Sequence, residues 1–410
     1  MTMSARRRRA HDKLAALPGV RSVRRPVTPE AGERFDLYYV RSGPPGNHPV
    51  VVIPGGPGMS SIAAYQGLRK QAADQGIDVI MVEHRGVGLS RHDDSGADLP
   101  AEALTIVQVV DDIAAVLDDA GVDTAAVYGT SYGTYLAAGM GVRHPDRVAA
   151  MVLDSPLLNR DDFDVVRREF RKMFWDNDSE LAGKIRTLSD AGALESEDLT
   201  IAAAVYGFGG AELLSRHLDV LLDGRRLLWN TLREITSYVA RRTTPFQSES
   251  DLVGPIGFRE LNFAGSPDGL PLDTTLTWRG APGADIPFER EPFDLAAAMP
   301  QFRWPTVVIS GGRDLITPAA VADRIVELLP QPTLVRLPTA AHSVLDTRGE
   351  AARRIIAEVV GGRPEALAAQ SDALDRLPSI MPVRIGETAL ALAPRIAAVL
   401  PRFGVPRLTT

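Results

Sequence analysis

Short apolar runs rich in valine and isoleucine alternate along the chain with longer segments in which apolar residues recur at helical spacing. This alternation is typical of a mostly parallel β-sheet that is covered by helices on both faces. The apolar runs predict strands over Phe35–Val40, Val50–Ile53, Val79–Glu83, Ala125–Tyr128, Ala149–Leu153, Thr306–Ser310 and Thr333–Leu337.

The clearest predicted helix spans Ala103–Ala120. Its apolar residues fall at i, i+3, i+4, i+7, i+10 and i+11 from Ile106, which places them on one stripe of a helix. The acidic residues of this segment are Asp111, Asp112, Asp118 and Asp119. We expect these carboxylates to form a solvated helix face rather than a metal site.

The alternation of strands and helices stops after Ser155 and resumes at Pro305. An interruption of this size inside an open sheet predicts an α/β fold with an inserted, mainly helical cap. The predicted domains are an N-terminal arm with a possible first strand at 1–34, an α/β core at 35–154 and 300–362, the cap at 155–299, and a C-terminal helical extension at 363–410. The extension contains a helix-like run at Glu387–Leu400, to which the sequence assigns no role.

The net charge and the cysteine content exclude several classes of function. The chain has 410 residues, a formal net charge of -7 and no cysteine. An acidic balance argues against nucleic-acid binding, which normally needs a basic surface, and the lack of cysteine excludes disulfides and a cysteine nucleophile. No run of about 18 apolar residues is present to span a membrane. We therefore expect a cytoplasmic protein that binds neither nucleic acid nor membranes, and its oligomeric state is left open.

One basic cluster, Arg6–Arg9, departs from this acidic balance. Such runs are usually solvated tails, so a solvated arm is expected, with a contact to a membrane or polyanion as the alternative. No apolar stretch of the about 7 to 15 residues that a signal peptide needs lies between this cluster and Arg21.

A candidate nucleophile lies in the sequence GTSYGT at 129–134, where Ser131 has a glycine two positions away on each side. The sequence follows the predicted strand Ala125–Tyr128 and precedes the helix-like Tyr135–Arg143, which is the setting of a nucleophile elbow. Glycines are needed there because the turn is strained and closely packed. Ser131 should project at the carboxyl edge of the sheet, where open α/β sheets bind ligands.

A serine hydroxyl needs a base that takes its proton and an acid that orients this base. His342, in the loop PTAAHS after a predicted strand, is the preferred base, and Asp314, in SGGRDLITP after the preceding strand, is the preferred acid. With Ser131 they give the order serine, acid, histidine at three strand ends. His217, inside the predicted cap, is a weaker candidate base, and Asp154 is the alternative acid.

Catalysis of this kind also needs two backbone N–H donors for the oxyanion. The residue after the nucleophile, Tyr132, supplies one by its position. The other should come from the loop IPGGPG at 53–58, in which Gly56 is the preferred donor. No metal or organic cofactor is needed by this chemistry, and we expect a structural role for the nearby His84, His92, Glu83 and Asp93.

Several motifs together resemble one enzyme family. They are GGPG at 55–58, HRGVGLS at 84–90, GTSYGT at 129–134, RDLITP at 313–318 and AH at 341–342. Over about residues 35–360, the chain resembles the proline iminopeptidase and tripeptidyl aminopeptidase branch of the α/β-hydrolases. Those enzymes usually have HGGPG in the first motif and DQRG or DHRG in the second. Here Pro54 replaces the histidine and Glu83 replaces the aspartate, and both departures leave the candidate triad untouched.

The resemblance implies a serine hydrolase that releases an N-terminal residue, such as proline, or a short peptide through an acyl-enzyme intermediate. It also implies a cap carboxylate that binds the protonated N-terminus of the substrate. Glu260, in FRELNF at 258–263, is the preferred candidate among the acids of the cap. The other cap acids considered are Glu169, Glu180 and Glu234.

Two alternatives remain. The first is an esterase, lactonase, thioesterase or carbon–carbon hydrolase that acts on a small metabolite, because the same triad serves all of these reactions. The second is a non-catalytic protein that binds a ligand on this fold, although binding alone would not require a triad and oxyanion donors.

Overall fold

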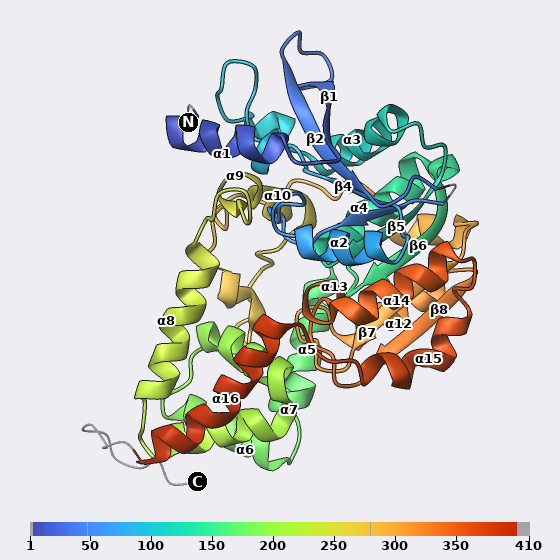
Figure 1. The fold of residues 1–410 in the computed structure, drawn as a ribbon. Helices are drawn as coiled ribbons and strands as arrows, with labels where there is room; N and C mark the ends of the chain where they lie inside the picture. Colours follow the sequence, from blue (N-terminus) through green and yellow to red (C-terminus); the bar gives the residue numbers. More distant parts are fainter. Residues whose placement is uncertain (1–2, 47, 279, 400–410) are drawn as a thin grey trace.

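The computed structural model describes residues 3–46, 48–278 and 280–399 (Figure 1). Within these residues, an 8-stranded sheet has the strand order β1-β2-β4-β3-β5-β6-β7-β8. The strands are β1 Val20–Pro26, β2 Arg34–Ser42, β3 Val50–Ile53, β4 Val79–Val82, β5 Ala125–Thr130, β6 Val148–Asp154, β7 Thr306–Gly311 and β8 Pro332–Leu337. β2 pairs antiparallel with β1 and β4, and the other neighbours are parallel. The predicted mostly parallel sheet is confirmed.

Apolar cores lie on both faces of this sheet. In β3, Val51 and Ile53 belong to one core while Val50 and Val52 belong to the other. The helices that contribute to the first core include α3 Ile106–Asp119, α4 Tyr132–Arg143 and α12 Ala319–Leu328. Those of the second include α2 Gln66–Asp74, α14 Gly349–Val360 and α15 Ala366–Asp375. Because both faces are covered, the central strands are continuous apolar runs.

The residues between β6 and β7 add no strand to the sheet, although these two strands are direct neighbours. They form helices that enclose a third apolar core, which includes Phe174, Leu214 and Trp229. The helices of this core are α5 Asp162–Phe174, α6 Glu180–Asp190, α7 Leu199–Leu222 and α8 Leu227–Arg241, whereas the following α9 Ser250–Val253 and α10 Pro255–Leu261 contribute to the first core. We call them, together with α16 described next, the helical layer.

The segment after residue 362 has two different partners. α15 packs against β8, whereas α16, Met381–Val399, packs against α7 and α8 (Figure 1). The C-terminal helix therefore joins the helical layer, and the last residue of the predicted run, Leu400, lies outside the described residues.

Two surface expectations hold only in part, because Asp118, Asp119, Arg6, Arg8 and Arg9 are exposed but Asp112 and Arg7 are not. Asp112 is fully buried rather than solvated, because its carboxylate accepts hydrogen bonds from Arg85 at 2.7 and 2.8 Å and from Arg25 at 2.8 Å. The basic arm forms a helix, α1 Ala5–Ala15, whose N-cap is the Ser4 side chain. Of its basic cluster, Arg7 is half-buried and forms an ion pair with Glu249, so the arm is not simply solvated.

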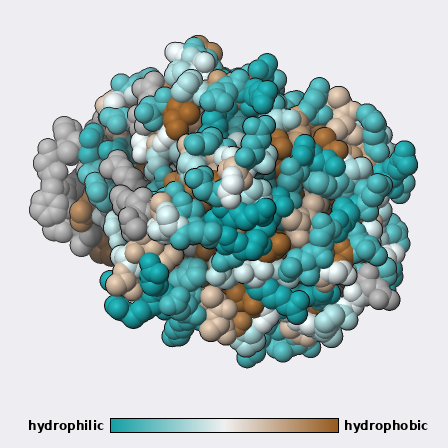
Figure 2. Space-filling model, turned by 90° about the horizontal axis from the view of Figure 1, so that it is seen from above, coloured by the Kyte–Doolittle hydropathy of each residue, from teal (hydrophilic) through white to brown (hydrophobic). Residues whose placement is uncertain are grey.

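The face that carries the N-terminal elements is mostly hydrophilic, with isolated apolar residues (Figure 2). Among the described helices, none has both the length and the apolar character needed to cross a bilayer.

Candidate active site

Ser131 lies in a sharp turn between β5 and α4. Its backbone has φ 53° and ψ -125°, a conformation that an L-residue adopts only when the surrounding structure enforces it. A Cβ at Gly129 would overlap the backbone of Gly133, and a Cβ at Gly133 would overlap the backbone of Ile53. The flanking glycines are therefore required by close packing of the turn, as the sequence predicts.

The structure brings the hydroxyl, the imidazole and the carboxylate of the candidate triad together. Ser131 Oγ lies 2.9 Å from His342 Nε2, and His342 Nδ1 lies 2.9 Å from Asp314 Oδ2. The three residues follow β5, β8 and β7, whose carboxyl ends lie on the same edge of the sheet because these strands are parallel.

Asp314 is buried and held by the start of its own loop. Oδ1 accepts the backbone N–H groups of Ile316 and Thr317, each at 2.9 Å, and Oδ2 accepts the Thr317 hydroxyl at 2.9 Å. Burial raises the pKa of Asp314, but the charge and hydrogen bond of His342 together with the two hydrogen bonds from Thr317 hold the pKa below its usual value. The carboxylate therefore stays ionised and faces the imidazole.

Burial lowers the pKa of His342, but the negative charge and hydrogen bond of Asp314, together with the negative charges of Asp154 and Asp346, raise the pKa above its ordinary value. The hydrogen bond to the carboxylate also favours the tautomer in which Nδ1 carries the proton and Nε2 can accept one from Ser131.

The alternative acid, Asp154, lies against other groups. It accepts the backbone N–H groups of Val344 and Leu345 at 3.1 and 2.9 Å and the Tyr128 hydroxyl at 2.9 Å. Asp154 thus holds the segment that follows His342, and Asp314 is the carboxylate in contact with the imidazole.

The two residues predicted to supply oxyanion donors both lie near Ser131. Tyr132 is the first residue of α4, and the N–H groups of a first helical turn have no partner within the helix. Gly56 lines the same pocket as Ser131, and a Cβ on the adjacent Gly55 would lie 3.1 Å from the Ser131 Cβ. This placement is compatible with donation by both N–H groups, which stays a prediction.

A pocket of about 990 Å³ lies beside these residues, at the upper end of the range of small-molecule sites. Ser131, His342 and Gly56 line it from the sheet. Much of the remaining wall is apolar and comes from the helical layer and the segment after it, including Phe163, Val166, Phe170, Leu199, Phe208 and Trp278.

The carboxylates in the described wall of this pocket have hydrogen-bond partners. Asp162 accepts two backbone N–H groups and a guanidinium N–H of Arg324 at 3.2 Å, and burial raises its pKa to about 6. Glu195 accepts a backbone N–H in a capping box, and Glu387 accepts the Ser379 hydroxyl at 2.8 Å.

Glu260, the expected amine-binding residue, does not line the pocket in the described structure. Its carboxylate accepts the backbone N–H of Ile106, at the start of α3, at 2.9 Å and a guanidinium N–H of Arg259 at 2.8 Å. An acidic side chain at a helix N-terminus is stabilised by the helix dipole, which explains why the carboxylate lies there. The placement does not match the expected role.

Glu83 and His84, for which a structural role is expected, are both buried. Buried Glu83 accepts backbone N–H groups of Ser61, Ile62 and Leu89, and burial raises its pKa to about 7. Burial lowers the pKa of His84 to about 4. Across the described ranges, no group of three or more His, Cys, Asp or Glu side chains is arranged to hold a metal ion.

The sheet order and the nucleophile turn define an α/β-hydrolase fold, and residues 48–187 match the family model described as "alpha/beta hydrolase fold". A solved structure of proline iminopeptidase from Mycobacterium smegmatis supports the fold, with a TM-score of 0.50 and 18% identity over 84% of this chain and 99% of that chain.

Curated relatives are similar to part of this chain. It is 29% identical over 131 residues to the proline iminopeptidase of Neisseria meningitidis, covering 32% of this chain and 40% of that protein. It is 32% identical over 124 residues to a probable proline iminopeptidase of Leptolyngbya boryana, covering 30% of this chain and 36% of that protein. The chain therefore matches no more than 40% of the length of these two relatives. The resemblance stated from the motifs is confirmed.

Proposed function

We propose that the protein is a serine hydrolase that forms an acyl-enzyme on Ser131. The observation that carries this proposal is the continuous chain from the Ser131 hydroxyl through His342 to Asp314, with both contacts at 2.9 Å, in the wall of a large pocket. A serine that only stabilised a turn would not need a strained backbone, an imidazole and a buried carboxylate in this order.

In the first half of the reaction, His342 Nε2 takes the hydroxyl proton as Ser131 Oγ attacks the carbonyl carbon of the substrate. The N–H groups of Tyr132 and Gly56 bind the oxyanion of the tetrahedral intermediate. His342 then gives its proton to the leaving amine or alcohol, and the ester on Ser131 remains. In the second half, His342 takes a proton from water, the hydroxide attacks the ester, and the proton returns to Ser131 as the acid leaves.

For the substrate, we propose a short peptide from which the N-terminal residue is released. This proposal is supported by the similarity to proline iminopeptidases and by the apolar wall contributed by the helical layer. An apolar wall would accept a proline ring or another apolar side chain through the burial of its surface.

Ester hydrolysis is the second candidate, and the engaged carboxylates favour it. Asp162, Glu195 and Glu387 already have partners, and Glu260 lies outside the described pocket wall. An ester or thioester with an apolar acyl group needs no carboxylate for recognition.

A matched set of chromogenic substrates tests both candidates. Prolyl and alanyl p-nitroanilides carry a free amine, their N-acetylated forms lack it, and p-nitrophenyl esters of graded chain length carry no amine. Turnover that requires the free amine supports the peptidase, whereas efficient turnover of esters alone supports the second candidate. Ser131→Ala is the control, and equal turnover by the wild type and this variant for every substrate would reject the serine hydrolase itself.

A further inference from the structure

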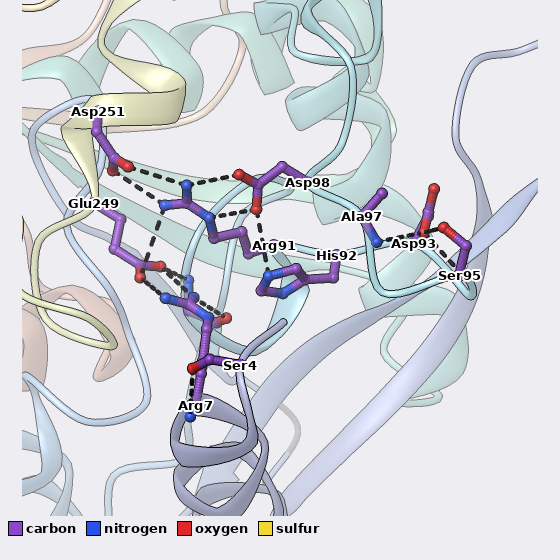
Figure 3. A network of polar contacts seen from close by, with 11 residues as sticks. Ser4, Arg7, Arg91, His92, Asp93, Ser95, Ala97, Asp98, Glu249 and Asp251 are labelled. Carbon is purple, nitrogen blue, oxygen red and sulfur yellow. Dashed lines mark hydrogen bonds and ion pairs between the residues drawn. The ribbon is translucent and has the colours of Figure 1, made fainter. Parts of the chain in front are cut away.

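A side chain of the N-terminal helix α1 contacts the buried carboxylate of Glu249, the residue directly before α9. The Arg7 guanidinium donates to both oxygens of Glu249, one of them at 3.0 Å, and to the carbonyl oxygen of Gly88 at 3.1 Å (Figure 3). It also lies 4.6 Å from the centre of the Phe246 ring, which is a cation–π distance. Arg6, Arg8 and Arg9, its neighbours in the basic cluster, are exposed.

Glu249 is fully buried and connects three segments. Its Oε2 accepts the backbone N–H of Gly88 at 2.6 Å, and its own backbone N–H donates to the carbonyl oxygen of Gly58 at 2.9 Å. Arg91 approaches the same carboxylate at 3.9 Å (Figure 3). A buried carboxylate is costly unless its charge is balanced, and Arg7 provides the closest balance.

The segment 246–250 is paired with the loop that carries Gly56. Ser60 donates its backbone N–H to the Gln247 carbonyl at 2.9 Å and its hydroxyl to the Phe246 carbonyl at 2.5 Å. Met59 and Ser248 form an antiparallel bridge. The Arg7 side chain therefore contacts Phe246 and Glu249, one within the turn and one after it, in the segment that pairs with residues 58–60.

Glu83 holds the same loop from the other side. Its Oε2 accepts the N–H groups of Ser61 and Ile62 at 2.6 and 3.0 Å. A Cβ on Gly88 would overlap its carboxylate, so Gly88 lies between the side chains of Glu83 and Glu249. The loop after Gly56 is thus fixed by two buried carboxylates, and only Glu249 depends on the N-terminal helix.

We propose that Arg7 and Glu249 are positioning residues that hold the loop 56–60 in the conformation needed for the Gly56 N–H to bind the oxyanion. The inference rests on the proposed serine hydrolase. Without Arg7, the carboxylate of Glu249 loses its closest ion pair and keeps only the longer contact with Arg91 at 3.9 Å, and the segment 246–250 is free to shift together with the loop. Displacing this donor by about 1 Å should weaken its hydrogen bond to the oxyanion of the transition state, whereas substrate binding should change little. We therefore expect kcat to fall more than KM changes.

The test compares Arg7→Ala with Arg8→Ala, which removes an exposed neighbour from the same helix. Turnover is measured with the best substrate from the panel, and inhibition is measured with an arylboronic acid, which forms a tetrahedral adduct on serine. For Arg7→Ala we expect kcat to fall about tenfold or more, KM to change less than about twofold, and boronate inhibition to weaken in parallel with kcat. Arg8→Ala should have the kcat and KM of the wild type. Arg7→Lys should recover part of kcat, because lysine keeps the positive charge but lacks the planar guanidinium that donates to both carboxylate oxygens.

Thermal melting of each variant shows the temperature at which all are folded, and the kinetics are compared there. A folded Arg7→Ala with wild-type kcat, or with only a raised KM, overturns the inference. If Arg7→Ala does not fold, Arg7→Lys and Glu249→Gln decide by the same comparison of kcat with KM. The proposed function is judged separately by Ser131→Ala, so turnover that depends on Ser131 but not on Arg7 leaves it standing.

Discussion

The carboxyl edge of the sheet and the helical layer form opposite sides of one pocket, and they are built in different ways. At the sheet edge, Ser131, Asp314 and His342 each have a fixed partner at hydrogen-bond distance, and the backbone of Ser131 is strained. In the helical layer, the pocket wall is largely apolar, and its carboxylates are engaged in structural hydrogen bonds. The difference indicates that the edge would perform the chemistry while the layer would select the substrate.

The largest expected effect comes from Ser131→Ala. We expect kcat to fall by about 10⁴- to 10⁶-fold, because the nucleophile is lost while the oxyanion donors and the pocket remain. The melting temperature should change little or rise, since alanine adds no atoms to the turn. Steady-state kinetics and thermal melting of the purified variant check both expectations.

Asp314 and Asp154 are buried carboxylates at the sheet edge, and replacing each one shows which of them takes part in the chemistry there. Asp314→Asn should lower kcat by about 10⁴-fold, because the amide favours the wrong tautomer of His342. Asp154→Asn keeps the triad contacts but weakens the bonds to Val344 and Leu345. We expect this variant to lose stability and to keep a larger share of kcat than Asp314→Asn. The reverse ranking in kcat would identify Asp154 as the catalytic acid.

The pH profile should show a fall in activity on the acid side. The base must be neutral, and the pKa of His342 is raised above its ordinary value of 6.5, with burial opposing and Asp314 supporting the rise. Activity is therefore lost as pH falls through this raised pKa, and the midpoint of kcat/KM should lie above about 6.5. Asp314→Asn should move the midpoint to lower pH. A flat profile between about pH 5 and 8 would contradict the assignment of His342.

A smaller effect is expected in the helical layer. Gly210 has φ 69° and ψ -165° inside α7, a conformation that is essentially restricted to glycine. Gly210→Ala should destabilise the protein by about 1–3 kcal/mol, measured by urea unfolding. Because the helical layer is expected to select the substrate, Gly210→Ala should change KM more than it changes the rate of covalent labelling of Ser131. Loss of labelling in a folded variant would show that the layer also shapes the triad.

The sequence predicts the sheet well where strands are buried on both faces, because β3 to β7 are apolar runs, and it also predicts the less buried edge strand β8. It predicts β1 only as a possible first strand within residues 1–34, because the sequence VRSVRRP of this edge strand is largely polar. The sequence pattern indicates a helix over Ala211–Leu222 but not over the first half of α7, since the glycines at 207, 209 and 210 interrupt the helical pattern. The sequence also does not predict the burial of Asp112, because its partners Arg85 and Arg25 are distant in the chain.

The active-site residues likewise divide into those with a local sequence pattern and those whose partners are distant in the chain. Ser131, Asp314 and His342 are found because each follows a recognisable strand, and parallel strands bring their carboxyl ends together. The direction of Glu260 is not predictable, because a motif gives a position along the chain but not the partner of a side chain. Thr317, which donates to Asp314, lies within the motif RDLITP but has no signal of its own. The pairing of Arg7 with Glu249 spans 242 positions and has no local pattern.

The most direct test of the proposed chemistry is covalent labelling of the folded protein with a fluorophosphonate, followed by peptide mass mapping. The account predicts one adduct, on Ser131, which forms more slowly at low pH and is absent from Ser131→Ala. A folded wild-type protein that stays unlabelled at neutral pH, or carries its adduct on another serine, would contradict it.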